Sequence, residues 1–140
     1  MREPELVSTI MTKNVVGLTR SDSLERANVL FNRFKIKHIP VVSGESIIGL
    51  LSFTDLMRIS QVEAPDTFNG KTINTIVQNT YTIEQVMAKD IVTITTDTTI
   101  KEAAKILSNR EFHALPIVEN GTLVGIITTR DLLKYLVKQL

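Results

Sequence analysis

The sequence predicts an α/β (α+β) fold built from two pseudo-symmetric repeats, each with the order strand, helix, strand, strand, helix. A stretch with glycine, two aliphatic residues, a hydroxyl residue and an aspartate occurs twice, at Gly49–Asp55 and at Gly125–Asp131. The two aspartates lie 76 positions apart (131 − 55), and the same offset relates Met11 to Met87. Each half also alternates β-rich runs with helical periodicity. Self-similarity at a fixed spacing indicates two copies of one structural unit.

The composition excludes several classes of protein. The 140 residues include 16 basic and 15 acidic ones, so the net charge is +1, and a protein that wraps a polyanion would have a clear basic excess. The chain has no cysteine, which excludes disulfides, thiolate metal sites and cysteine nucleophiles. No apolar run is long enough to span a bilayer, and the N-terminus lacks the features of a signal peptide. We therefore expect a cytoplasmic protein with no nucleic-acid or membrane partner.

In the first repeat, Leu24, Ala27, Phe31 and Phe34 recur at helical spacing and predict an amphipathic helix. The spacing of Asp22 and Glu25 is that of a capping box at its start. β-rich runs on either side of a Ser-Gly-Glu-Ser segment predict a hairpin. The expected elements are a short strand at 15–19, a helix at 23–35, a hairpin with strands at 39–42 and 47–51, and a helix that begins near Asp55.

The second repeat follows the same plan, with Asn120-Gly121 as a strong hairpin signal. Its last helix is expected to carry an apolar face made of Leu132, Leu133, Leu136 and Val137. The predicted boundaries are repeat 1 at 6–60, a surface linker with about one helical turn at 61–82, and repeat 2 at 83–137. Since a half of this size buries little apolar surface alone, we expect the repeats to pack face to face.

The order Met-x-Lys, short strand, amphipathic helix, aliphatic-Pro-Val-Val or Pro-Ile-Val, hairpin and Gly-x-x-Ser/Thr-x-x-Asp resembles a CBS domain. Two copies in tandem resemble a CBS pair, or Bateman module, and the resemblance to the stand-alone form covers nearly the whole chain. It implies a regulatory module that binds an adenosyl compound such as AMP, ATP or S-adenosylmethionine and modulates an effector protein. It also implies a homodimer that is not an enzyme and uses no catalytic cofactor.

The pairs Ser52…Asp55 and Thr128…Asp131 allow two interpretations. A hydroxyl residue followed three positions later by an acid is the pattern of a helix N-cap. The same helix start offers main-chain N–H groups to a phosphate, while the aspartate could accept hydrogen bonds from ribose hydroxyls. The resemblance favours the second role, because aspartates at this position are the usual ribose ligands of the family. The two roles are compatible.

The resemblance further implies that each ligand cleft combines strand residues of one repeat with the helix start of the other. One implied cleft consists of Met11, Val16, Lys37, His38, Pro40, Thr128, Arg130 and Asp131. The other consists of Met87, Val92, His113, Ala114, Pro116, Ser52, Thr54 and Asp55. For the apolar members, packing in the core is the alternative role.

The two clefts are not equally equipped for an anionic ligand. Arg130 precedes one motif aspartate, whereas Thr54 precedes the other, and an arginine presents a planar fork to phosphate that threonine lacks. We therefore expect the cleft with Arg130 to bind a nucleotide better. Two histidines without an acidic cluster do not predict a metal site, and no catalytic triad or carboxylate pair stands out. The main rival hypothesis is a nucleotide-free dimerisation or interaction module in which the aspartates only cap helices.

Overall fold

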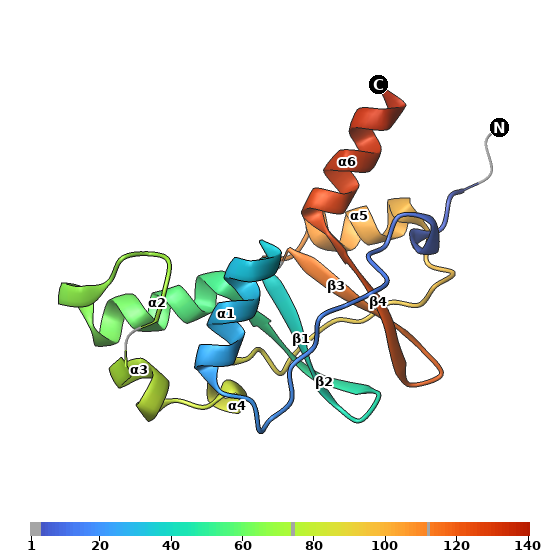
Figure 1. The fold of residues 1–140 in the computed structure, drawn as a ribbon. Helices are drawn as coiled ribbons and strands as arrows, with labels where there is room; N and C mark the ends of the chain where they lie inside the picture. The colour runs from blue at the N-terminus through green and yellow to red at the C-terminus, as the bar shows by residue number, and fades with distance from the viewer. Residues whose placement is uncertain (1–3, 74, 112) are drawn as a thin grey trace. The chain divides into compact units, whose positions relative to one another are not determined.

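The computed structural model describes residues 4–73, 75–111 and 113–140 (Figure 1). The first three residues, part of the N-terminus assessed above for a signal peptide, lie outside this range. The chain forms two compact units, and each is described by itself. The first-repeat unit is Val16–Asp90, and the second-repeat unit combines Met1–Val15 with Ile91–Leu140.

The first-repeat unit contains α1 (Leu24–Phe34), β1 (His38–Ser43), β2 (Ser46–Ser52), α2 (Phe53–Glu63), η2 (Pro65–Thr67), α3 (Thr75–Thr80) and α4 (Ile83–Val86). The predicted helix and hairpin are confirmed. The predicted capping box is wrong, because the Ser23 side chain accepts the N–H of Arg26. The Asp22 carboxylate instead accepts the N–H of Thr19 at 2.8 Å in the preceding turn.

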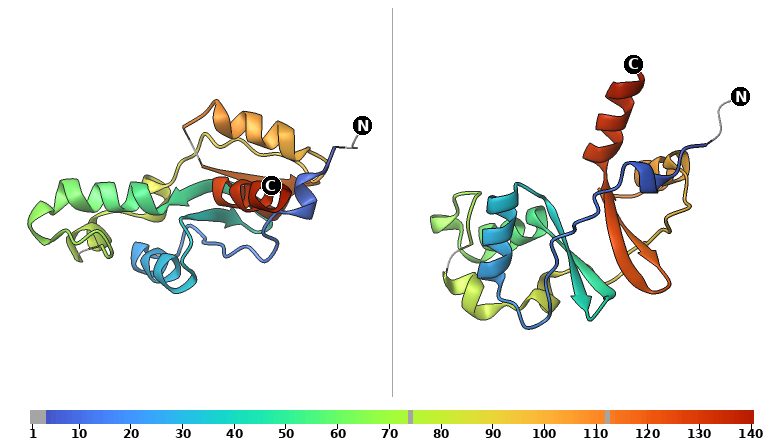
Figure 2. Two further views of the ribbon diagram at one scale, coloured as in Figure 1. Left: turned by 90° about the horizontal axis from the view of Figure 1, so that it is seen from above. Right: turned by 45° about the vertical axis from the view of Figure 1, so that its right-hand side comes forward.

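The second-repeat unit contains η1 (Val7–Thr9), α5 (Ile100–Ser108), β3 (Ala114–Glu119), β4 (Thr122–Thr128) and α6 (Thr129–Gln139) (Figure 2). Asn120 and Gly121 both have positive φ, of 51° and 81°, as a two-residue hairpin turn requires. The β3–β4 hairpin is therefore confirmed where the Asn-Gly pair predicted it.

The strand expected at the start of each repeat is shorter than predicted. In the first-repeat unit, Leu18 forms one parallel bridge with Val41, and its N–H donates to the Pro40 carbonyl at 2.9 Å. Ile94 forms the equivalent bridge with Ile117 in the second-repeat unit. In each unit the expected strand is thus reduced to a single bridge. The Leu18 side chain is nevertheless fully buried.

The segment between the repeats, which was expected to be a surface linker with about one helical turn, contains η2 and α3. α3 packs on α2, and Val77 is fully buried in the core of the first-repeat unit. The Tyr81 hydroxyl donates to the Glu63 carboxylate at 2.8 Å, and this hydrogen bond raises the pKa of Tyr81. The few apolar residues of this segment thus pack against the core of the first-repeat unit.

The first residues of each repeat pack on the hairpin of the other repeat. Thr12 exchanges two main-chain hydrogen bonds with Ile126, at 2.9 and 3.0 Å, and Met11 lies against Gly125. A Cβ at Gly125 would lie 2.7 Å from the Met11 sulfur, so only glycine leaves room for this contact. Met87 packs against Gly49 in the same way in the first-repeat unit. The boundaries of the two packed units, after Val15 and after Asp90, therefore differ from the boundaries of the sequence repeats.

None of the helices within the described ranges has both the length and the apolarity that crossing a membrane requires.

Candidate ligand-binding site

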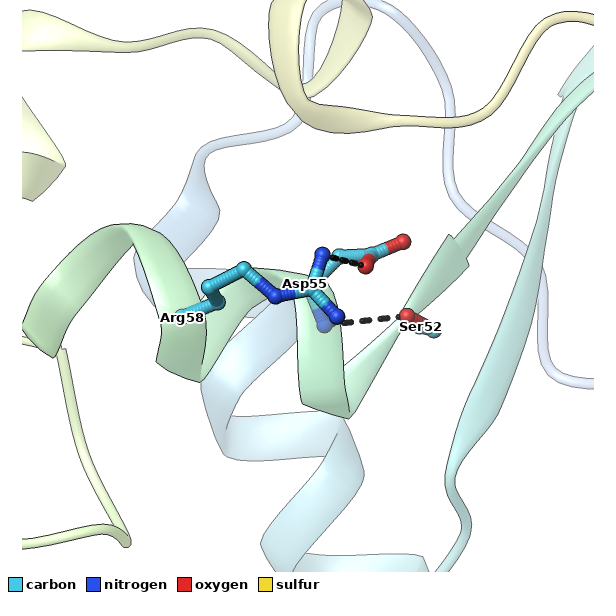
Figure 3. A network of polar contacts seen from close by, with 3 residues as sticks. All are labelled: Ser52, Asp55 and Arg58. Atoms are coloured by element: carbon cyan, nitrogen blue, oxygen red, sulfur yellow. Dashed lines mark hydrogen bonds and ion pairs between the residues drawn. The ribbon is translucent and has the colours of Figure 1, made fainter. Parts of the chain in front are cut away.

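The hydroxyl–aspartate motif of the first repeat lies where β2 turns into α2 (Figure 3). Ser52 is the N-cap, and its side chain accepts the N–H of Asp55 at 3.0 Å. The N–H of Phe53 donates to the Lys37 carbonyl at 2.9 Å. These bonds use the first and third N–H groups of the helix, so the second, on Thr54, is the group that a ligand could reach.

The carboxylate of Asp55 has a cationic neighbour that sequence reasoning missed. Arg58 Nη1 lies 2.8 Å from Asp55 Oδ1, one helical turn further along (Figure 3). Both side chains are substantially exposed, so the ion pair adds little to stability. It does neutralise the charge that would otherwise face a ligand. The i,i+3 spacing of an acid and an arginine on a predicted helix was the signal for it.

The equivalent helix start in the second-repeat unit is capped more completely. The Thr128 hydroxyl accepts the N–H of Asp131 at 3.2 Å, and Asp131 Oδ2 accepts the N–H of Thr128 at 2.9 Å. The two residues thus form a reciprocal capping box. Among the described residues, the hydrogen bonds to the Asp131 side chain all use Oδ2, which leaves Oδ1 for another donor.

The capping interpretation is therefore confirmed at both motifs. The ligand interpretation stays a prediction, and the capping bonds do not conflict with it. Arg130 is exposed and forms no ion pair with any residue in the described ranges, whereas its counterpart Thr54 is exposed and carries no charge. The sequence predicted one difference between the two helix starts, Arg130 in place of Thr54. The structure adds a second difference, the Asp55–Arg58 ion pair.

Each helix start lies beside the beginning of the hairpin in its own unit. His38 lies opposite Ser52 in the strand register, and the Lys37 ammonium lies 4.2 Å from the centroid of the Phe53 ring. Ala114 lies opposite Thr128 in the other unit, as expected from the repeat.

Likewise, the His113 carbonyl accepts the N–H of Thr129 at 3.0 Å. The structure thus brings together the polar candidates of one repeat within one unit. The predicted clefts combine polar candidates from both repeats, and that combination stays a prediction.

The apolar candidates all have a packing role inside a unit. Val16 and Val92 pack half-buried against the two cores. Pro40 and Pro116 are buried, and their carbonyls accept the N–H groups of the short parallel bridges. The contacts of Met11 and Met87 with the two hairpin glycines are described above. A ligand role for these six residues stays a prediction.

Within the described residues, no three His, Asp or Glu side chains come together as a metal ion would require.

Comparisons with known proteins identify the family. The family model described as "CBS domain" matches residues 7–61 and 83–138. The protein MJ1225 of Methanocaldococcus jannaschii is 28% identical over 135 residues, which cover 95% of this chain and 48% of that protein. Inosine-5'-monophosphate dehydrogenase of Staphylococcus epidermidis is 33% identical over 127 residues, which cover 88% of this chain and 22% of the enzyme. The chain thus spans less than half the length of these curated relatives.

Two solved structures show the fold. One is a CBS domain pair of the protein MJ0100 in complex with 5'-methylthioadenosine and S-adenosyl-L-methionine. It has a TM-score of 0.80 and 21% identity, and the match covers 99% of this chain and 100% of that chain. The other is CBSX2 in complex with AMP, with a TM-score of 0.78, 21% identity and coverage of 96% and 98%. Both repeats are matched by the family model, so this chain belongs to the CBS domain family and is a tandem CBS pair.

Proposed function

We propose that this CBS pair is a regulatory module that binds an adenosyl compound of the AMP, ATP or S-adenosylmethionine class and modulates a partner protein. The observation that carries the proposal is the hydroxyl–aspartate helix start, which occurs once in each unit with its carboxylate only half-buried. Two solved structures of similar fold, one in complex with AMP and one with S-adenosyl-L-methionine, support the ligand class. No catalytic role is proposed for any residue.

At such a helix start, the chemistry suits a nucleotide. The half-buried carboxylate of Asp131 accepts hydrogen bonds from ribose hydroxyls through Oδ1, each contributing about 1.5–3 kcal/mol as a bond to a charged group. The second N–H of the helix and its positive dipole end favour a phosphate by about 0.3–1 kcal/mol. The exposed guanidinium of Arg130 adds a charge-assisted contact to the phosphate.

The two helix starts should differ in affinity. A ribose at Asp55 has to compete with Arg58 for the carboxylate oxygen at 2.8 Å, and Thr54 offers a phosphate no charge. Asp131 faces no such competitor among the described side chains. We therefore propose that an anionic nucleotide binds preferentially through the second-repeat helix start.

The second candidate function is an interaction module without a ligand. It is favoured by the fact that both aspartates already serve their helices, one in a capping box and one in an ion pair. A homodimer fits either function. In the first-repeat unit, the exposed apolar side chains of Val29, Phe34 and Val62 could contribute to such a contact.

A thermal-shift panel of AMP, ADP, ATP, S-adenosylmethionine and NAD separates the two functions. A ligand that binds only the folded protein at a hundredfold excess over its Kd stabilises it by about 2.7 kcal/mol, which raises the Tm by several degrees. Unchanged melting curves at millimolar ligand would favour the interaction module.

A further inference from the structure

The internal repeat places a methionine against a hairpin glycine in each unit, and the two methionines differ in exposure. Met11 packs against Gly125 and Met87 packs against Gly49. Met87 is 8% exposed, whereas Met11 is only half-buried against the core of the second-repeat unit. Met57 is 7% exposed. Of the methionines in the described ranges, Met11 is therefore the one that a dissolved reagent reaches most readily.

The exposed thioether gives this chain a redox chemistry of its own. The sequence has no cysteine, so no thiol of the chain competes for an oxidant. A peroxide transfers one oxygen atom to a methionine sulfur: the sulfur lone pair forms the S–O bond while the O–O bond breaks, and hydrogen peroxide leaves as water. The sulfur is oxidised by two electrons and the peroxide is reduced by two. A methionine sulfoxide reductase reverses the change with a dithiol, which becomes a disulfide as water is released.

The surroundings of the Met11 sulfur suit a thioether and not a sulfoxide. The sulfur lies close to the Gly125 backbone, since a Cβ on that glycine would be only 2.7 Å away. The side chain also packs against an apolar cluster that includes Val7 and Ile127. A sulfoxide oxygen is a hydrogen-bond acceptor, and burying it without a donor is costly. The oxidised side chain should therefore leave its contact with Gly125.

This contact adjoins a main-chain bridge. Thr12, the next residue, exchanges two hydrogen bonds with Ile126 of β4, at 2.9 and 3.0 Å. No other main-chain hydrogen bond between residues 11–15 and β4 is formed in the described ranges. A bridge of two bonds depends on the side-chain packing beside it, so the loss of the Met11 contact should let it open.

We infer that Met11 is a site of reversible oxidation, and that its sulfoxide releases the chain around Thr12 from β4. The first-repeat unit provides an internal reference, because Ala88 follows the buried Met87 and exchanges two equivalent hydrogen bonds with Leu50, at 2.9 and 3.0 Å. The inference goes beyond the proposed nucleotide function and does not depend on it.

The first test is the rate of oxidation by hydrogen peroxide. Trypsin cuts after lysine and arginine, which places the four methionines on four different peptides, at 1–2, 3–13, 38–58 and 72–89. Mass spectrometry of these peptides should show Met11 oxidised at least about fivefold faster than Met57 and Met87 in the folded protein. In concentrated urea the three rates should become similar, because the difference arises from burial.

The second test is amide hydrogen exchange of the oxidised protein. Exchange at Thr12 and Ile126 should become faster by about tenfold or more, whereas exchange at Leu50 and Ala88 should not change. Treatment with a methionine sulfoxide reductase and dithiothreitol should restore the original rates.

Two variants provide the matched pair. Met11→Leu keeps an apolar side chain without sulfur, so peroxide should no longer change the exchange at Thr12 and Ile126. Met87→Leu should respond to peroxide as the unchanged protein does. Circular dichroism checks that both variants are folded, and the reversal by the reductase takes the place of Met11→Leu if that variant is not.

The proposal is overturned if Met57 or Met87 is oxidised as fast as Met11 in the folded protein. It is also overturned if complete oxidation of Met11 leaves the exchange at Thr12 and Ile126 unchanged, or if folded Met11→Leu shows the same acceleration. None of these readouts uses a nucleotide, so a failure of the proposed nucleotide function would leave this test unaffected.

Discussion

Replacing Asp131 by asparagine separates the capping role of this residue from its proposed ligand role. Asparagine can still accept the N–H of Thr128 through its amide oxygen, the bond that is 2.9 Å long in the structure. It loses the negative charge at the helix N-terminus, where a charge contributes about 0.3–1 kcal/mol. The bond from the Thr128 hydroxyl, at 3.1 Å, is also weakened. We expect the free energy of unfolding to fall by about 1 kcal/mol.

The effect of Asp131→Asn on nucleotide affinity should be larger than its effect on stability. Hydrogen bonds from ribose hydroxyls to a charged acceptor contribute about 1.5–3 kcal/mol each, so the Kd for AMP should rise by about tenfold or more. Urea unfolding followed by circular dichroism measures the stability, and calorimetry measures the affinity. Asp55→Asn is the control, since Arg58 already neutralises that carboxylate and its loss should change affinity less. A fall in stability with unchanged AMP affinity would refute the ligand role of Asp131.

Three further predictions follow from single contacts. Arg130→Ala should weaken AMP binding by about 1.5–3 kcal/mol and leave adenosine binding unchanged, whereas Thr54→Ala should change neither. Calorimetry at two salt concentrations checks this, because the contact between Arg130 and the phosphate should weaken as the salt concentration rises. Gly125→Ala should destabilise the protein by about 1–3 kcal/mol, because the new Cβ would lie 2.7 Å from the Met11 sulfur, and Met11→Ala should recover part of this loss in urea unfolding. Val77→Ala should destabilise by about 1–3 kcal/mol, because its side chain is fully buried; a change within the error of the unfolding measurement would mean that α3 does not pack as described.

Local signals were sufficient to predict most of the secondary structure. The period of apolar residues identified α1, and Asn120-Gly121 identified the β3–β4 turn, because both depend on neighbours in the chain. The packing of α3 in the core was not predicted, because its segment has few apolar residues. Its position depends on partners far along the chain, such as Asn28, which binds the N–H of Ile73.

The packing of Met11 on the hairpin of the other repeat could not be predicted from the sequence either. The glycine and the methionine were each part of the repeat pattern, yet the pattern does not state which copy of the glycine meets which methionine. Non-local packing of this kind leaves no periodic signal.

At the candidate site, spacing alone predicted the caps at Ser52 and Thr128, because an N-cap depends only on residues three positions apart. The difference between the two aspartates required the structure. Asp55 pairs with Arg58 and Asp131 forms a capping box, although both motifs have the same spacing.

The central claim is that the folded chain binds an adenosyl nucleotide, and titration calorimetry of AMP into the unchanged protein tests it most directly. We predict saturable binding, with a Kd for Asp131→Asn that is about tenfold higher or more. Absence of saturable heat at millimolar AMP, with circular dichroism showing a folded protein and with ATP and S-adenosylmethionine equally silent, would contradict the claim.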